Sequence, residues 1–165
     1  MRRTTMSKST SPPVIVVVDS TVGTPAQQAV TFASVRAQTR KPDFTFVVFN
    51  GDSPPPQKIY QAGATVLLLA NTRTPGSQGA FNTGIMRAVS RFGQDCWIAT
   101  LGVWSEWQQN HLELCLRAVT KGSPEDCKWV STGVRTSSGD SVLPPPVLPD
   151  ASTFFVTTSG IRTRR

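Results

Sequence analysis

The sequence predicts an α/β fold, a mostly parallel sheet with helices on both faces, and two observations lead to it. Short apolar runs rich in β-branched residues alternate with segments of helical periodicity, which is the order that builds βαβ units. The first run, VIVVVD at 14–19, is apolar without alternation, as expected for a central strand covered on both faces. A length of 165 residues suits one domain with a core of its own.

The other elements follow along the chain. Thr24 and Pro25 form an N-cap and N1 pair, and Val30 recurs with alanines at helical spacing behind them, so a helix is expected over residues 25–38. Further strands are expected at 44–49, 65–69, 96–101 and 128–134, with a short edge strand at 152–158. Two more helices are expected from apolar stripes, Phe81, Ile85, Ala88, Val89 and Phe92 in one and Leu112, Cys115, Leu116 and Val119 in the other.

The net charge of +7 lies mainly at the two ends of the chain. Residues 1–13 and 160–165 contain six Lys and Arg residues and no acid, which leaves +1 for the body. We expect residues 1–12 to form a disordered basic tail, residues 13–140 to form the folded body, and both ends to contact it little. Because aromatic side chains do not cluster among Lys and Arg, the sequence argues against nucleic acid as a partner.

The cysteines and the apolar runs bear on the compartment. Cys96, Cys115 and Cys127 are odd in number and include no C-x-x-C pair, which favours reduced thiols in a cytoplasmic protein. Cys96 and Cys115 have apolar neighbours and are expected to be small core residues. The run VIVVV is too short to span a membrane, so no membrane partner is expected.

Residues for catalysis are scarce, and we assign none. His111 has no Cys or Ser partner at a telling spacing, so it is expected to be packed or solvated. Neither G-x-x-x-x-G-K-[ST] nor G-x-G-x-x-G occurs, so the two common phosphate-binding loops are excluded.

Several segments in order carry a resemblance to a known family. They are VIVVVDSTVGTP, FNGDS, NTRTPGSQGAFNTGI, and WIATL followed after a turn by EW and NHLELCLRAV. The ordered set resembles the nucleotide-sugar half of the family 2 glycosyltransferases, which have the Rossmann-like GT-A fold, over roughly residues 13–140. The resemblance implies an NDP-sugar of the UDP type as ligand, and it identifies no protein partner.

The resemblance also assigns eight residues to nucleotide-sugar binding: Asp19, Ser20, Thr21, Asn50, Asp52, Arg73, Gly79 and Asn82. The first three occupy the loop where such enzymes hold the base and ribose. FNGDS stands where the family has D-D-G-S, so Phe49 and Asn50 replace the usual pair of acids, and Asp52 is the candidate substitute acid. An alternative for Gly79 and Asn82 is that they only start a helix.

One turn departs from the family. Where the family has Leu-Asp-Asp-Asp-Asp-x-Trp, this chain has LGVWSEW at 101–107. The resemblance therefore identifies a degenerate metal-motif turn, Gly102, Val103, Trp104, Ser105 and Glu106. A divalent ion held by carboxylates would position the diphosphate and stabilise it as it leaves. With these acids missing we expect no metal ligand, and Mn²⁺ or Mg²⁺ only if the donor site is functional.

Residues 141–165 resemble a truncated start of the acceptor half followed by a basic tail. The function expected from the resemblance is a family 2 glycosyltransferase-like protein that is catalytically impaired. One alternative is a non-catalytic partner-binding or vestigial GT-A module. A weaker alternative is nucleic-acid binding through the basic tails.

Overall fold

A computed structural model describes residues 11–51, 54, 65–93, 95–121, 129–131, 134–135, 141–142 and 159–162. The strands are β1 (Val14–Asp19), β2 (Phe44–Phe49), β3 (Thr65–Ala70), β4 (Trp97–Gly102), β5 (Trp129–Ser131), β6 (Val134–Arg135), β7 (Ser141–Val142) and β8 (Ser159–Arg162). The helices are α1 (Pro25–Arg36), α3 (Ser77–Phe92) and α4 (His111–Lys121).

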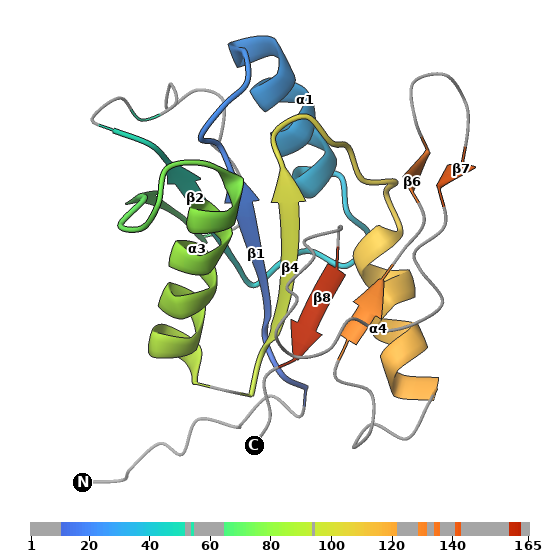
Figure 1. Ribbon diagram of the computed structural model, residues 1–165. Coiled ribbons are helices and arrows are strands. Elements are labelled where there is room, and N and C mark those ends of the chain that lie inside the picture. The colour runs from blue at the N-terminus through green and yellow to red at the C-terminus, as the bar shows by residue number, and fades with distance from the viewer. Residues whose placement is uncertain are drawn as a thin grey trace, which may run out of the picture.

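Six of these strands form one sheet in the order β3, β2, β1, β4, β8, β5 (Figure 1). β1 pairs in parallel with β2 and with β4, and β2 pairs in parallel with β3. β8 is antiparallel to both β4 and β5, while β6 and β7 form a separate antiparallel pair. The order β3-β2-β1-β4 is that of a Rossmann-like sheet. The predicted α/β class and mostly parallel sheet are therefore confirmed.

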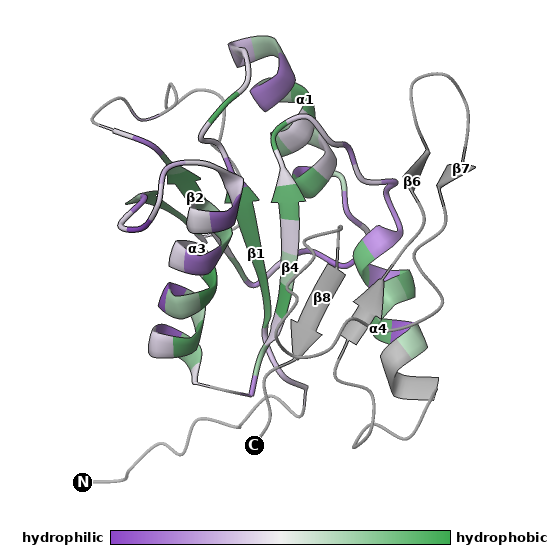
Figure 2. Ribbon diagram, viewed as in Figure 1, coloured by the Kyte–Doolittle hydropathy of each residue, from purple (hydrophilic) through white to green (hydrophobic). Residues whose placement is uncertain are grey.

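The two faces of β1 pack against different helices. Val14, Val16 and Val18 belong to a core shared with α1 and α4. Ile15 and Val17 belong to a second core, shared with α3. Figure 2 shows the result: β1 is apolar along its length, and the side of α3 that faces the sheet is apolar too. Burial on both faces explains why the strand sequence shows no alternation.

Helix α1 starts as predicted but buries a different face from the one that its alanines mark. Thr24 is the N-cap and forms a capping box with Gln27. The alanines are exposed, and Val30 is 51% exposed. The buried residues of the helix are Gln28, Thr31, Phe32, Ser34 and Val35. Polar side chains can occupy a buried face when hydrogen-bond partners are waiting there.

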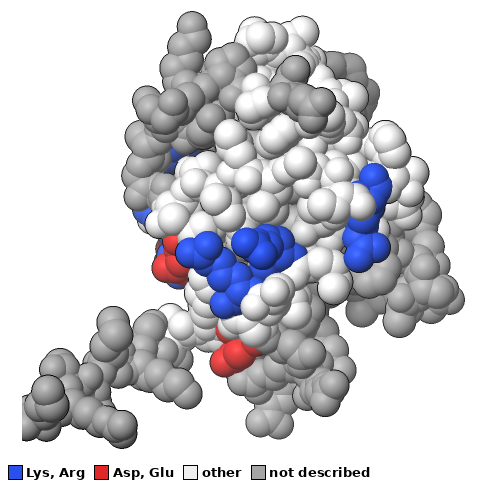
Figure 3. All heavy atoms as spheres, turned by 90° about the vertical axis from the view of Figure 1, so that its left-hand side faces the viewer, with Lys and Arg blue, Asp and Glu red and all other residues white. Residues whose placement is uncertain are grey.

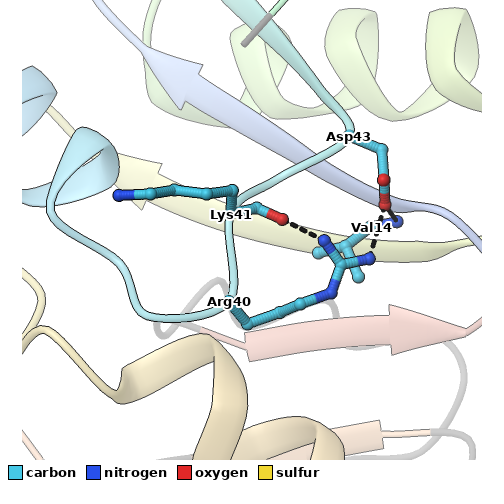
Figure 4. A network of polar contacts seen from close by, with 4 residues as sticks. All are labelled: Val14, Arg40, Lys41 and Asp43. Atoms are coloured by element: carbon cyan, nitrogen blue, oxygen red, sulfur yellow. Dashed lines mark hydrogen bonds and ion pairs between the residues drawn. The ribbon is translucent and has the colours of Figure 1, made fainter. Parts of the chain in front are cut away.

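A small polar network fixes the amino ends of β1 and β2 (Figure 4). The backbone N–H of Val14 donates to Asp43 Oδ2 at 2.7 Å, and the N–H of Asp43 donates to the carbonyl of Val14 at 2.8 Å. Arg40 pairs with the same carboxylate at 2.7 Å and also donates to the carbonyl of Lys41. This network sets the register of the two strands from the edge opposite the candidate site.

The carboxyl-terminal part of the chain differs in places from what the sequence predicts. The expectation that residues 160–165 contact the body little is wrong for 160–162, which lie in β8 and pair with β4 and β5. The strand expected at 128–134 is divided between β5 and the start of β6. Residues 1–10 and the edge strand expected at 152–158 lie outside the described residues. Among the described helices, none has the length and apolar character needed to cross a membrane.

Candidate functional site

The order of the strands reverses between β1 and β4, which is the position where open α/β sheets form a ligand crevice. β1, β2 and β3 follow one another outward, and the chain then returns through α3 to β4 on the other side of β1. Ligands of open α/β sheets bind outside the carboxyl ends of the strands at such a reversal. Asp19 ends β1 and lies opposite Gly102, the last residue of β4. The loop after β1 and the turn after β4 are thus adjacent, as the sequence predicted.

Asp19 is fully buried, and only one of its carboxylate oxygens is hydrogen-bonded. Oδ1 accepts hydrogen bonds from the N–H of Thr21 at 2.9 Å and from its hydroxyl at 2.6 Å. Within the described part of the chain, Oδ2 is buried without a partner. Ser20 is also buried, and its hydroxyl accepts a bond from Gln28 at 3.1 Å. The end of β1 therefore holds a carboxylate oxygen that still requires a donor.

The turn after β4 packs against the loop after β1. The N–H of Val103 donates to the carbonyl of Asp19 at 3.0 Å. A Cβ placed on Gly23 would lie 2.7 Å from Val103 Cγ1, so these two segments are in close contact. Ser105 is half-buried and Glu106 is exposed. The turn thus has one buried apolar side chain and no carboxylate at its centre.

Helix α1 holds this turn in place through its polar face. The hydroxyl of Thr31 shares its single proton between the carbonyls of Val103 and Ser105, at 2.7 and 2.9 Å. Ser34 accepts a bond from the N–H of Trp107 at 3.2 Å. Sequence reasoning missed both positioning residues. The available signal was a set of polar residues at helical spacing on one side of a helix that must cover a sheet.

The turn does not fit a divalent metal ion. The side chains of Gly102, Val103 and Trp104 carry no oxygen, and the carbonyls of Val103 and Ser105 are directed to Thr31. The carbonyl of Gly102 accepts a bond from the N–H of Ser105 at 2.9 Å. Among the described residues, no three His, Cys, Asp or Glu side chains come together. Mn²⁺ and Mg²⁺ require several oxygen ligands, and this turn does not provide them.

Trp104 extends from the turn back over the end of β4. A Cβ placed on Gly102 would lie 2.8 Å from both Cε2 and Cζ2 of the indole, so the ring occupies the space that a side chain at this position would fill. The side chain is 53% exposed. Trp104 therefore covers the end of β4 with one side of its ring and presents another to solvent.

The second part of the site is a hollow at the start of α3. Its volume is about 410 Å³, and it is lined by Arg73, Thr74, Pro75, Gly76, Ser77, Gln78, Gly79 and Asn82. Gly76 is the N-cap of α3 and supplies no capping side chain, and the first turn contains no acid. A Cβ on Gly79 would lie 1.9 Å from the carbonyl oxygen of Thr74, so this position requires glycine for the approach of the loop. Three of the eight predicted residues meet in this hollow.

Asn71 ties the hollow to the neighbouring strand, and sequence reasoning did not single it out. Its Nδ2 donates to Asn50 Oδ1 at 2.8 Å and to the carbonyl of Thr74 at 3.0 Å. Its Oδ1 accepts bonds from the N–H of Arg73 at 3.0 Å and from the hydroxyl of Thr83 at 2.9 Å. The predicted Asn50 is thus turned toward the loop after β3. Asp52 lies outside the described residues.

Comparisons with known proteins add no relative to this picture. A scan against protein-family models and a search of curated proteins both found no match. The candidate site is therefore defined by two groups of residues of this chain: those around Asp19 and Trp104, and those around the hollow.

His111 and Cys115 form a pair that geometry alone would nominate for catalysis. The Cys115 Sγ lies 3.8 Å from His111 Nε2, and the imidazole stacks on Trp107 with ring centroids 4.7 Å apart. Burial lowers the pKa of His111 to about 4 and raises the pKa of Cys115 to about 11. Both groups are neutral at pH 7, so the thiolate that a nucleophile requires is absent. His111 is a packed residue, as the sequence predicted.

The charged residues of the body show a modest basic face. Figure 3 shows Lys and Arg gathered on the side of the molecule turned toward the viewer, with acidic atoms at the border. Arg87 and Arg91 of α3 are exposed, and the guanidinium of Arg91 lies 4.5 Å from the centre of the Phe44 ring. Part of this charge therefore takes part in packing through a cation–π contact.

Proposed function

We propose that this chain is a GT-A-type module that binds a nucleotide or an NDP-sugar of the UDP type without metal-dependent sugar transfer. The observation that carries the proposal is the meeting of Arg73, Gly79 and Asn82 around one hollow of about 410 Å³. The order of the sequence segments alone predicts these three residues as part of a nucleotide-sugar site. Their convergence beside a strand-order reversal is what a nucleotide site requires.

The chemistry of the hollow suits a diphosphate. Arg73 offers a planar guanidinium that can donate two parallel bonds to phosphate oxygens. The α3 amino terminus adds a partial positive charge, since its N-cap supplies no side chain and its first turn no acid. Asn82 adds an amide on the hollow wall. An anion placed here is stabilised by fixed donors without a metal ion.

The crevice between β1 and β4 suits the other end of the ligand. Asp19 Oδ2 is a buried acceptor to which no described residue donates, and the N–H groups of a pyrimidine base or the hydroxyls of a ribose supply such donors. Trp104 lies in the turn where the family carries its metal-binding acids. An indole there excludes an ion that would bridge the turn and a diphosphate, which supports binding without transfer.

A non-catalytic partner-binding module is the second candidate, and one observation favours it. Val22 and Trp104 lie in the loop and the turn that meet at the crevice, and both are more than half exposed. Large apolar side chains that share a rim are common at protein interfaces. Under this alternative the crevice is a contact surface and binds no nucleotide.

A thermal-shift screen of nucleotides and NDP-sugars, run with EDTA and with Mn²⁺, separates the two candidates. A ligand at 100 times its dissociation constant stabilises a protein by about 2.7 kcal/mol. We expect UDP or a UDP-sugar to raise the melting temperature equally under both conditions. If no nucleotide raises the melting temperature, nucleotide binding is wrong and the partner-binding module is favoured.

A pair of variants localises the binding. We expect Arg73→Gln to remove most of the UDP-dependent shift, because Arg73 lines the hollow. Arg87→Gln is the matched control, since Arg87 is an exposed arginine of α3 that is not part of the hollow. Equal losses in the two variants would show that the shift arises from general positive charge.

A further inference from the structure

The carboxylate of Asp19 is incompletely satisfied in a place where water cannot reach it. Among the residues that the structure describes, its Oδ2 is buried without a partner, and so is the hydroxyl of Thr100 on β4. In the strand register Val17 lies opposite Thr100 and Asp19 opposite Gly102, so both polar groups are on the face of the sheet that carries α3. A buried polar group left unpaired destabilises the folded state, and a charged group does so more strongly. Such a cost at the mouth of a crevice calls for an explanation.

The indole of Trp104 packs on Gly102, the residue of β4 that lies opposite Asp19 in the strand register. Side chains of register partners on neighbouring strands point to the same face, with Cβ atoms about 5 Å apart. The indole lies against the Cβ position of Gly102, with Cε2 and Cζ2 2.8 Å and Nε1 3.2 Å from it, and Gly102 is the register partner of Asp19. The indole N–H is a hydrogen-bond donor. Because Oδ2 has no partner within the described part of the chain, this N–H does not donate to it in the observed position of the ring.

The indole of Trp104 is weakly held. Trp104 is 53% exposed, so one side of its ring gains little from packing. The backbone beneath it is firmly held, since Thr31 binds the carbonyls on both sides of Trp104, those of Val103 and Ser105. The side chain can therefore rotate away while the turn stays in place. Rotation uncovers a charged acceptor and exposes apolar surface that is already half exposed.

We propose that the Trp104 indole is a displaceable cover over a ligand-binding acceptor, Asp19 Oδ2. The ligand that fits is a ring with an N–H donor, such as the imide edge of a pyrimidine base, and this part of the inference rests on the proposed nucleotide binding. The ligand displaces the indole and donates to Oδ2, forming a charge-assisted hydrogen bond. The cover thus makes the closed crevice the resting state and lowers the apparent affinity of the nucleotide.

A substitution at Gly102 displaces the Trp104 indole without removing it from the chain. The backbone of Gly102 lies outside the positive-φ glycines, so alanine is compatible with the main chain there. The added methyl group would lie 2.8 Å from the indole, which is too close for both to stay. Because the clash is with the far end of an exposed side chain, the indole moves and the sheet does not. Gly102→Ala therefore opens the crevice while keeping Trp104 in the chain.

Carbodiimide labelling of carboxyl groups in the presence of an amine, read by peptide mass spectrometry at Asp19, tests the cover directly. We expect Trp104→Ala and Gly102→Ala to label at Asp19 about tenfold faster than the unmodified chain or more, a factor that corresponds to about 1.4 kcal/mol of opening free energy. Val30→Ala is the control, because Val30 is as exposed as Trp104 but lies on α1, across the sheet. Its labelling at Asp19 should be unchanged. Equal rates in all four proteins would overturn the cover, whatever nucleotides do.

A separate measurement tests whether the ligand binds at Asp19. UDP added to Trp104→Ala should slow the labelling of Asp19, and the variant should bind UDP more tightly than the unmodified chain. If UDP shifts the melting temperature yet leaves the labelling rate of Asp19 unchanged in Trp104→Ala, Asp19 is not the acceptor. If UDP binds neither protein, the proposed function and the binding of the ligand at Asp19 fail together, while the contrast in labelling still decides whether Trp104 is a cover.

Discussion

Asn71 joins the loop after β3 to the end of β2 and to the second turn of α3. Its amide makes four hydrogen bonds, to Asn50, Thr74, Arg73 and Thr83. We expect Asn71→Ala to lower the free energy of unfolding by about 1 to 3 kcal/mol, because the half-buried Asn50 and the buried Thr83 each lose a hydrogen-bond partner. Asn71→Asp keeps the acceptor and loses the donors, so its free energy of unfolding should lie between that of the unmodified chain and that of Asn71→Ala. Urea denaturation of the three proteins measures the difference, and an unchanged stability in Asn71→Ala would contradict this role.

His111 gives the stability a defined pH dependence. Burial lowers its pKa from 6.5 in the unfolded chain to about 4, so the unfolded state binds more protons between these values. The contribution of the neutral imidazole is complete above pH 6.5 and is lost as the pH falls toward about 4. We expect His111→Phe, which keeps a ring against Trp107, to lose less stability over this interval. Parallel slopes of urea midpoint against pH in the two proteins would contradict the assignment.

At the scale of single elements, α1 acts as the support of the turn after β4. Thr31→Val keeps the shape of the side chain and removes the donor to Val103 and Ser105. We expect a loss of about 1 to 3 kcal/mol and faster hydrogen exchange at the amide of Trp107, because two carbonyls of the turn lose a bond. Thr31→Ser is the control that keeps the hydroxyl. Exchange rates that are unchanged in Thr31→Val would show that the turn holds its shape without α1.

β8 is a strand whose removal is expected to lower the stability of the main sheet. It lies between β4 and β5 and pairs with both, so a chain ending at Thr158 leaves β4 with an unpaired edge. We expect that truncation to lower the melting temperature and promote aggregation through the open edge. Removal of residues 163–165 alone leaves β8 complete and is the matched control. Equal melting temperatures for the two truncated chains would contradict the pairing.

The elements were predictable where the signal was local, and the site was predictable only in part. Strands such as 14–19 follow from apolar runs, because burial on both faces leaves no other composition. The buried face of α1 could not be predicted, since Thr31 and Ser34 are buried by partners about 70 residues away. Arg162 was assigned to a tail on charge alone, whereas the backbone there pairs with Trp97. Asn71 was missed because its role depends on three segments that only the fold brings together.

At the scale of the whole molecule, one reversal of strand order gathers every described part of the candidate site. Asp19 and Trp104 lie where β1 and β4 end. The hollow around Arg73 lies at the start of α3. The first group offers an acceptor under a removable cover, and the second offers donors for an anion. The account therefore requires that binding energy comes from protein groups, with no contribution from a divalent ion at the turn.

Calorimetric titration of the complete chain with UDP, first in EDTA and then with Mn²⁺, tests that requirement most directly. The account predicts measurable heat of binding in EDTA and the same dissociation constant when Mn²⁺ is present, because the turn from Gly102 to Glu106 has no set of oxygen ligands for the ion. Binding that appears only with Mn²⁺, or that tightens tenfold or more with it, an effect of about 1.4 kcal/mol or more, would contradict the account. Absence of heat under both conditions would contradict it as well.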